Sequence, residues 1–228
     1  MDAAEIAARL DAVRKRIEAA LRRAGRAEGS VRLVAASKMQ SVQMMRAAYA
    51  AGVRDFGENY VQEALAKQAQ LSDLERIRWH LIGHLQTNKA KVAAGAFHLI
   101  QSLDSIRLAG ALARVRRDPP AAVLVEVNLG GEGSKTGVAP NQVEDLINAI
   151  RNQVEVRGLM AIPPPGPDCE FSRRYFVQLR RMRERLAAAC GLALSELSMG
   201  MSDDFEVAIE EGATIVRVGR AIFGERPR

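Results

Sequence analysis

The chain has 228 residues and a mass of 24.9 kDa, a length that suits one large domain. Hydrophobic residues make up 48% and charged residues 26%, which is ordinary for a globular protein and excludes wholesale disorder. The net charge of +6 permits a polyanion or a phosphate-bearing small ligand but requires neither. Two cysteines, Cys169 and Cys190, are too few for a disulfide framework. Since no signal peptide or membrane span is evident, we expect a protein of the reducing cytoplasm.

The chain opens with an amphipathic segment, residues 1–26. Its apolar residues Ile6, Leu10, Val13, Ile17 and Leu21 fall on one stripe, which predicts a helix that covers the rest of the fold. From residue 31 onward, short β-branched runs alternate with helical patterns. The predicted strands are Val31–Ser37, Val53–Gly57, Ile77–Gly83, Leu99–Leu103, Ala122–Leu129, Val154–Ile162, Leu197–Met201 and Thr214–Gly219.

Helix start and stop signals lie between these strands. Ser41 begins a predicted helix that Gly52 closes, and Asn59 begins another that runs to about Leu71. Three more predicted helices follow. The first begins at Ser105, the second has Pro140 at its first helical position, and the third begins after Ser202 and ends at Gly212.

Eight strands separated by helices predict a single α/β domain over residues 1–228, a (β/α)8 TIM barrel with an extra N-terminal helix. An open, doubly wound sheet is the alternative. That fold would normally carry a glycine-rich fingerprint after its first strand, where this chain has Ser37-Lys38-Met39.

In a (β/α)8 barrel, binding groups gather at the C-terminal ends of the strands. Lys38 ends the first strand, where desolvation would lower its pKa and favour the neutral amine that attacks an aldehyde. The alternative is a rim lysine that extends into solvent. Ser202 adds a hydroxyl next to a helix N-terminus, which suits an anion, although it could simply cap that helix. Arg217 lies at the end of the last strand, and the alternative for this residue is an ion pair at the barrel mouth.

An amine, an anion cradle and an inward arginine together suggest pyridoxal 5'-phosphate (PLP) held as an internal aldimine. Lys38 would lie opposite a phosphate cradle formed after the seventh and eighth strands. A class I aldolase that uses Lys38 on a sugar phosphate is an alternative from another class.

The chain also resembles the pyridoxal phosphate homeostasis proteins, which share the barrel of the alanine racemase N-terminal domain. The resemblance rests on VAASK (34–38), GENYVQEA (57–64), WHLIGHLQTNK (79–89), SLDS (102–105), EVNLGGEGSKTG (126–137), RGLMAIPP (157–164) and ELSMGMSDDFEVAIEEGATIVRVGRAIFG (196–224). It implies a fold type III PLP barrel without the C-terminal β domain of the racemases.

The resemblance also implies a role for each site residue. Lys38 would be the Schiff-base lysine, and Arg217 would face the pyridine nitrogen. The other implied contacts are Ser202, Gly219 and the backbone of Arg220 to phosphate, and Asn59, Gly83 and Met160 around the ring. Position 220 commonly carries a hydroxyl in this family, so the Arg220 side chain would either contact phosphate by charge or point outward.

A cation beside the pyridine nitrogen weakens the ring as an electron sink. Racemases of this fold add a tyrosine from a further C-terminal domain of a partner subunit, and this chain ends at Arg228. We therefore expect a monomeric PLP carrier that buffers the cofactor or delivers it to apoenzymes, without turnover. A low-activity, racemase-like PLP enzyme is the alternative.

Three other motifs indicate no separate function. His80 and His84 flank a strand end without a third ligand, so no metal site is expected. The arginines of residues 173–185 fit a solvated helix face better than a nucleic-acid site. Lys135 lies in a glycine-rich loop that lacks the spacing of a nucleotide-binding phosphate loop, and it is the nearest candidate for an alternative aldimine.

Overall fold

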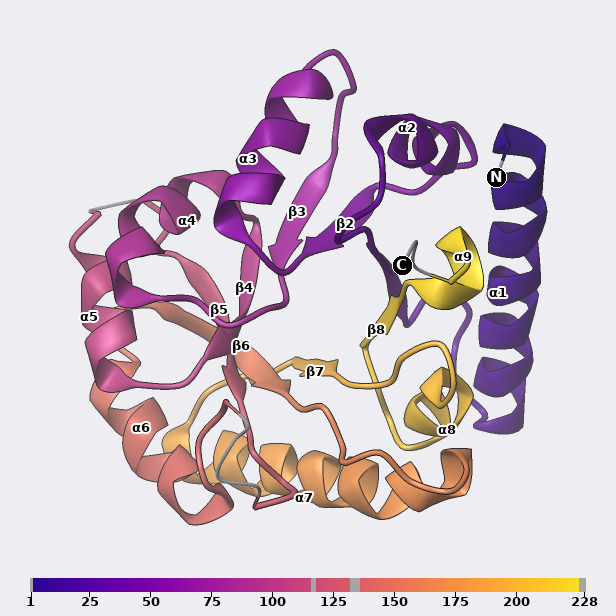
Figure 1. The fold of residues 1–228 in the computed structure, drawn as a ribbon. Coiled ribbons are helices and arrows are strands. Elements are labelled where there is room, and N and C mark those ends of the chain that lie inside the picture. The colour runs from indigo at the N-terminus through magenta and orange to yellow at the C-terminus, as the bar shows by residue number, and fades with distance from the viewer. Residues whose placement is uncertain (1, 116–117, 132–135, 226–228) are drawn as a thin grey trace.

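The computed structural model describes residues 2–115, 118–131 and 136–225. Eight parallel strands close into a barrel in chain order, with helices around the outside (Figure 1). The strands are β1 (Arg32–Ala36), β2 (Asp55–Glu58), β3 (Arg78–Leu81), β4 (Leu99–Leu103), β5 (Ala122–Glu126), β6 (Glu155–Met160), β7 (Glu196–Ser198) and β8 (Ile215–Val218). The eight predicted strands and the (β/α)8 barrel are thus confirmed. The open-sheet alternative is wrong because β1 pairs with β8.

Helices occupy the intervals between the strands. They are α1 (Ala3–Arg23), α2 (Val42–Ala50), α3 (Val61–Gln70), α4 (Ala90–Ala96), α5 (Ile106–Ala113), α6 (Val143–Ile150), α7 (Arg173–Cys190), α8 (Phe205–Glu210) and α9 (Arg220–Phe223), with 3-10 turns at Thr87–Lys89, Pro140–Gln142 and Cys169–Ser172. Ser41 and Ser105 cap α2 and α5 as predicted, since their hydroxyls accept hydrogen bonds from backbone N–H groups of the first turn.

Two helix starts differ from the prediction. The third helix begins at Val61, and its cap is Tyr60 rather than Asn59. The helix expected directly after Ser202 begins at Phe205, because residues 202–204 form a turn. The Ser202 hydroxyl instead accepts a hydrogen bond from the backbone N–H of Ala221, at 3.2 Å.

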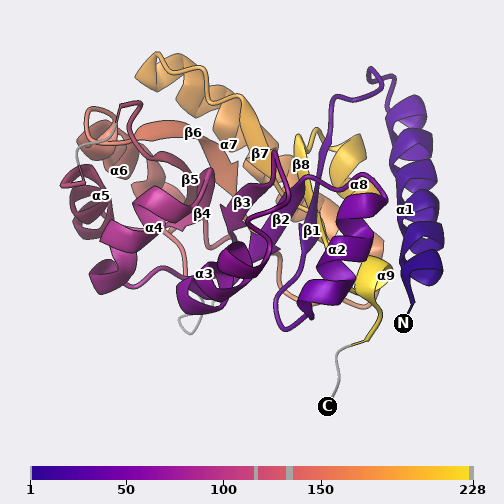
Figure 2. The same ribbon diagram turned by 90° about the horizontal axis from the view of Figure 1, so that it is seen from above.

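The N-terminal helix α1 belongs to the outer layer. Its apolar stripe is buried as predicted, together with Ala20, and it packs against α2, α8 and α9. Figure 2 shows α1 along the outside of the barrel beside these helices. Because α9 has only four residues, α1 covers the barrel wall that a longer final helix would cover.

Apolar side chains fill two separate regions. The larger core lies between strands and helices. A smaller cluster inside the barrel comprises Val34, Leu99, Ala122, Leu124, Met160 and Ile215. No helix among the described residues is long and apolar enough to cross a membrane.

A buried ionic cluster supports the segment that follows β1. The Lys67 ammonium lies 2.8 Å from Glu58 Oε1 and 2.7 Å from Glu63 Oε1, and it donates to the Ser37 carbonyl at 2.7 Å. The Ser37 hydroxyl donates to Glu58 Oε1 at 2.6 Å, and the Met39 backbone N–H donates to Glu63 at 2.6 Å. Both neighbours of Lys38 are therefore tied to one cluster.

Replacing Lys67 should destabilise the fold strongly. Glu58 is fully buried, and burial already raises the pKa of its carboxyl, against hydrogen bonds from Lys67 and Ser37. Lys67→Met leaves that group without its cation, so the free energy of unfolding at pH 7 should fall by about 3–5 kcal/mol. Chemical denaturation measures the change.

The control for this prediction is the double variant Lys67→Met/Glu58→Gln, which leaves no ionisable group at position 58. Its loss should be smaller than that of Lys67→Met alone. An equal or larger loss in the double variant would mean that the charge pair is not what stabilises the cluster.

Candidate functional site

Most of the predicted site residues line one cavity at the barrel mouth. The cavity has a volume of about 600 Å³, within the range of small-ligand sites. Its lining comprises Ala36, Lys38, Gln40, Asn59, Ile82, Ile162, Met201, Ser202, Asp203, Arg217, Gly219, Arg220, Gly224 and Glu225. Six of the eight predicted contacts are in this set, and they come from the ends of β1, β2, β7 and β8.

Lys38 enters this lining through a short turn after β1. The Ser37 N–H donates to the Gly57 carbonyl at 2.9 Å, which extends the pairing of β1 with β2 by one step. Met39 then adopts φ +61°, a left-handed conformation that is uncommon outside glycine, while its N–H is held by Glu63. Hydrogen bonds within the protein therefore hold the backbone on both sides of Lys38.

Arg217 is buried, with 4% of its surface exposed. It donates from Nη1 to the Ser198 hydroxyl at 2.5 Å and from Nη2 to the Ala161 carbonyl at 3.1 Å. Both acceptors are neutral, so the expected alternative, an ion pair at the mouth, is not found among the described residues. Burial lowers the pKa of Arg217 to about 10, and the guanidinium therefore stays charged near neutral pH.

Ser202 and Gly219 lie side by side at the start of α9. Gly219 caps this helix, and its backbone comes so close to β1 that an added Cβ would lie 3.0 Å from the Ala36 carbonyl oxygen. The cradle is therefore next to Lys38 around the mouth, not opposite it as the sequence suggested, because β1 and β8 are neighbouring strands.

The Arg220 side chain turns toward acidic neighbours. It forms an ion pair with Asp203 and lies 3.4 Å from Glu225 Oε1, and about half of it is exposed. Its backbone remains at the cradle, whereas its guanidinium is engaged with these two carboxylates.

The predicted ring contacts divide into three cases. Asn59 lines the cavity. Gly83 is not in the lining but packs against Asn59. An added Cβ at Gly83 would come within 2.6 Å of the Asn59 carbonyl oxygen, so glycine is required for this close approach. Met160 is fully buried in the interior cluster and is not part of the cavity lining.

Sequence reasoning missed several lining residues. Ile82 and Ile162 each follow a strand end, so the strand-end rule could have found them. Gln40 and Asp203 lie in turns whose paths depend on tertiary contacts, and no sequence pattern marked them.

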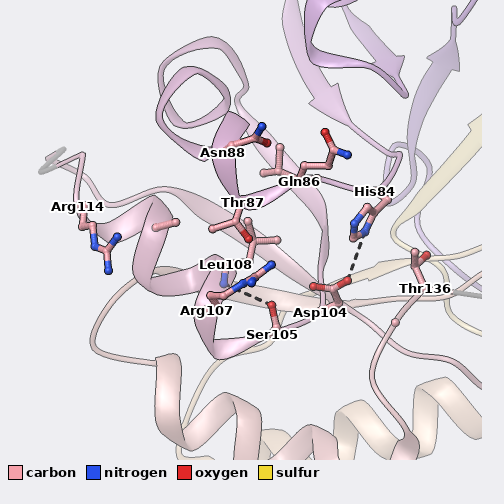
Figure 3. A pocket seen from close by; sticks show the side chains of 13 residues that line it. His84, Gln86, Thr87, Asn88, Asp104, Ser105, Arg107, Leu108, Arg114 and Thr136 are labelled. Atoms are coloured by element: carbon pink, nitrogen blue, oxygen red, sulfur yellow. Dashed lines mark hydrogen bonds and ion pairs between the residues drawn. The ribbon is translucent and has the colours of Figure 1, made fainter.

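A larger neighbouring cavity lies at the ends of β3 and β4 (Figure 3), with a volume of about 1270 Å³. There His84 Nδ1 lies 3.3 Å from Asp104 Oδ2. Its described lining contains no lysine, so it lacks the amine on which the predicted chemistry depends. Lys135 falls outside the described residues. Within the described part of the chain, no group of three or more His, Cys, Asp and Glu side chains is arranged to hold a metal ion.

The smaller cavity fits an anionic aldehyde such as PLP. The Lys38 amine and the Arg217 guanidinium line it together with the Ser202 hydroxyl and the backbone at Gly219. The two bonds to Ser198 and Ala161 engage only two of the five N–H donors of Arg217. The site can therefore offer an amine, a buried cation and hydrogen-bond donors to one small ligand.

Comparisons with known proteins show the family of the chain. Residues 8–227 match the family model described as the alanine racemase N-terminal domain. The chain is 46% identical over 222 residues to a pyridoxal phosphate homeostasis protein of Aquifex aeolicus, with 96% of this chain and 97% of that protein covered. It is 44% identical to the Pseudomonas aeruginosa protein of the same name, with 97% and 96% covered.

Solved structures give the same picture. PipY of Synechococcus elongatus, solved with PLP bound, is 40% identical with a TM-score of 0.84, and the match covers 96% of this chain and all of that one. Alanine racemase of Corynebacterium glutamicum shares the fold, with a TM-score of 0.75 and 18% identity over 62% of its own length. This chain therefore belongs to the family of pyridoxal phosphate homeostasis proteins.

Proposed function

We propose that this chain binds PLP in the 600 Å³ cavity through a covalent link to Lys38, and that it acts in PLP homeostasis. The observation that carries the proposal is the convergence of Lys38, Arg217 and the Ser202–Gly219 cradle on one cavity. The proteins that match along nearly their whole length are named for PLP homeostasis, and one relative was solved with PLP.

Each of these residues would have a distinct task. The aldehyde of PLP condenses with a primary amine and releases water, and Lys38 supplies that amine. Ser202 and the backbone at Gly219 and Arg220 would hold the phosphate, with Asn59 against the ring. Gly83 would support Asn59 from behind, and Met160 would support the site from the barrel interior.

Arg217 would face the pyridine nitrogen. Because it is buried and charged, it would disfavour protonation of that nitrogen and weaken the ring as an electron sink. The described lining also contains no tyrosine that could serve beside Lys38 as the second base of a racemase. Both features favour a carrier over the racemase-like alternative.

The carrier role has consequences outside the site. We favour a role as a monomer that buffers PLP in the cytoplasm or releases it to PLP-dependent apoenzymes. The free thiols of Cys169 and Cys190 fit a reducing compartment.

Lys38→Ala should abolish the covalent adduct while leaving the fold intact. The purified protein is titrated with PLP, reduced with borohydride and digested, and the adduct is located by mass spectrometry. The matched control is Lys91→Ala, an exposed lysine on α4, which should keep the adduct in full. A main adduct on another lysine of the wild-type protein, or no adduct at all, would refute the proposal.

Ser202→Ala should weaken PLP binding by about 1–2 kcal/mol, the usual value of a hydrogen bond to a charged group. Binding of pyridoxal, which has no phosphate, should not change. The control is Ser72→Ala, which removes an exposed hydroxyl bonded to the Ala69 carbonyl on α3. Equal PLP affinities for the wild type and Ser202→Ala would remove Ser202 from the phosphate site.

A further inference from the structure

A continuous line of buried polar side chains crosses the barrel interior behind Arg217. Arg217 Nη1 lies 2.5 Å from Ser198 Oγ, and Ser198 Oγ lies 2.6 Å from Gln101 Oε1. Gln101 Nε2 is 3.2 Å from His80 Nδ1, and His80 Nε2 is 2.9 Å from Asp55 Oδ1. We call these five residues, from β8, β7, β4, β3 and β2, the interior chain. Ser198, Gln101 and His80 are fully buried, and none of them lines the cavity.

The donors and acceptors of the interior chain follow one direction. A guanidinium can only donate, so the Ser198 oxygen accepts from Arg217 and its own hydrogen goes to Gln101 Oε1. The Gln101 amide nitrogen then donates to His80 Nδ1. His80 must therefore be neutral and carry its hydrogen on Nε2, from which it donates to Asp55. Burial lowers the pKa of His80, which agrees with a neutral ring.

Asp55 anchors the far end of the interior chain. It is the first residue of β2, at the opposite end of the barrel from the mouth. Arg78 binds its carboxylate with two hydrogen bonds, at 2.8 and 2.5 Å. Burial would raise the pKa of Asp55, but the bonds from His80 and Arg78 outweigh it and lower the pKa to about 2. The anchor is therefore a fixed negative charge at neutral pH.

This arrangement orients Arg217 without neutralising it. A carboxylate in direct contact would cancel the charge that the cavity needs, whereas Arg217 bonds to a hydroxyl and a carbonyl. Successive hydrogen bonds polarise one another, so Asp55 can strengthen the hold on Arg217 through three neutral side chains. Its charge stays directed at the cavity.

We infer that Ser198, Gln101 and His80 are positioning residues, which hold the Arg217 guanidinium in a fixed, charged orientation toward the cavity. The inference deepens the proposed function and rests on it where PLP is concerned. Its structural part concerns the protein alone and can be tested without cofactor.

The first experiment uses nitrogen-15 NMR on the full, cofactor-free chain. His80 should show the neutral form with hydrogen on Nε2, and the Arg217 guanidinium should rotate slowly, so that its Nη hydrogens give separate signals. Arg217→Lys identifies these signals by their loss. Gln101→Leu interrupts the interior chain two bonds away from Arg217 and should merge the signals into one averaged signal.

The second experiment titrates the same variants with PLP. Gln101→Leu should weaken binding about three- to tenfold, the equivalent of roughly one hydrogen bond. The control is Thr214→Val. This change removes the Thr214 hydroxyl, which bonds to Glu196 and to the Leu197 backbone N–H just before β8 begins. It should keep PLP affinity within about twofold, since it does not touch the interior chain. Thermal unfolding of each variant reports the loss of stability, and Ser198→Ala replaces Gln101→Leu if the latter does not fold.

The outcomes separate this inference from the proposed function. Slow Arg217 rotation that persists in both Gln101→Leu and Ser198→Ala overturns the positioning role, whatever PLP does. Free rotation with unchanged PLP affinity overturns it as well, because the fixed orientation would then have no effect on the ligand. A wild-type protein that does not bind PLP would refute the proposed function, while the NMR result would still decide whether the interior chain holds Arg217.

Discussion

The pairing of β1 with β8 is the constraint on which the site depends. Four registered pairs, from Arg32 with Ile215 to Ala35 with Val218, join the first strand to the last. This pairing brings Lys38 next to Gly219 and Arg217, although about 180 residues of chain separate them. Without closure, the amine and the anion cradle would lie at opposite edges of an open sheet and could not serve one ligand.

Two buried networks support Lys38 and Arg217 in different ways. Near Lys38, an ammonium and two carboxylates hold the neighbouring backbone, so that the turn after β1 is rigid. Behind Arg217, neutral side chains lead to an ionised aspartate at the far end of the barrel. In the second network Arg217 bonds directly to a hydroxyl and a carbonyl, and the negative charge of Asp55 lies at the other end.

In the proposed function, the same features would favour binding over turnover. A buried arginine on the pyridine nitrogen would reduce carbanion stabilisation. The polar residues at the rim, Asp203 and Glu225, are engaged with Arg220. The common fold with alanine racemase therefore does not imply its reaction, since function resides in the site and not in the barrel.

The sequence by itself predicted eight strands between helices and favoured a barrel over an open sheet, because no glycine-rich fingerprint follows the first strand. It also determined which residue types stand at the strand ends, because the end of each run can be read directly, and Lys38, Ser202 and Arg217 were found in this way.

The tertiary structure decided those features of the site that depend on contacts between residues far apart in the sequence. The cradle lies beside Lys38, because closure makes β8 the neighbour of β1. The helix after Ser202 starts late, because residues 202–204 form a turn, and the Ser202 hydroxyl bonds to the backbone of α9. The interior chain joins five strands across the barrel, and side chains that meet only after the barrel closes leave no local pattern in the sequence.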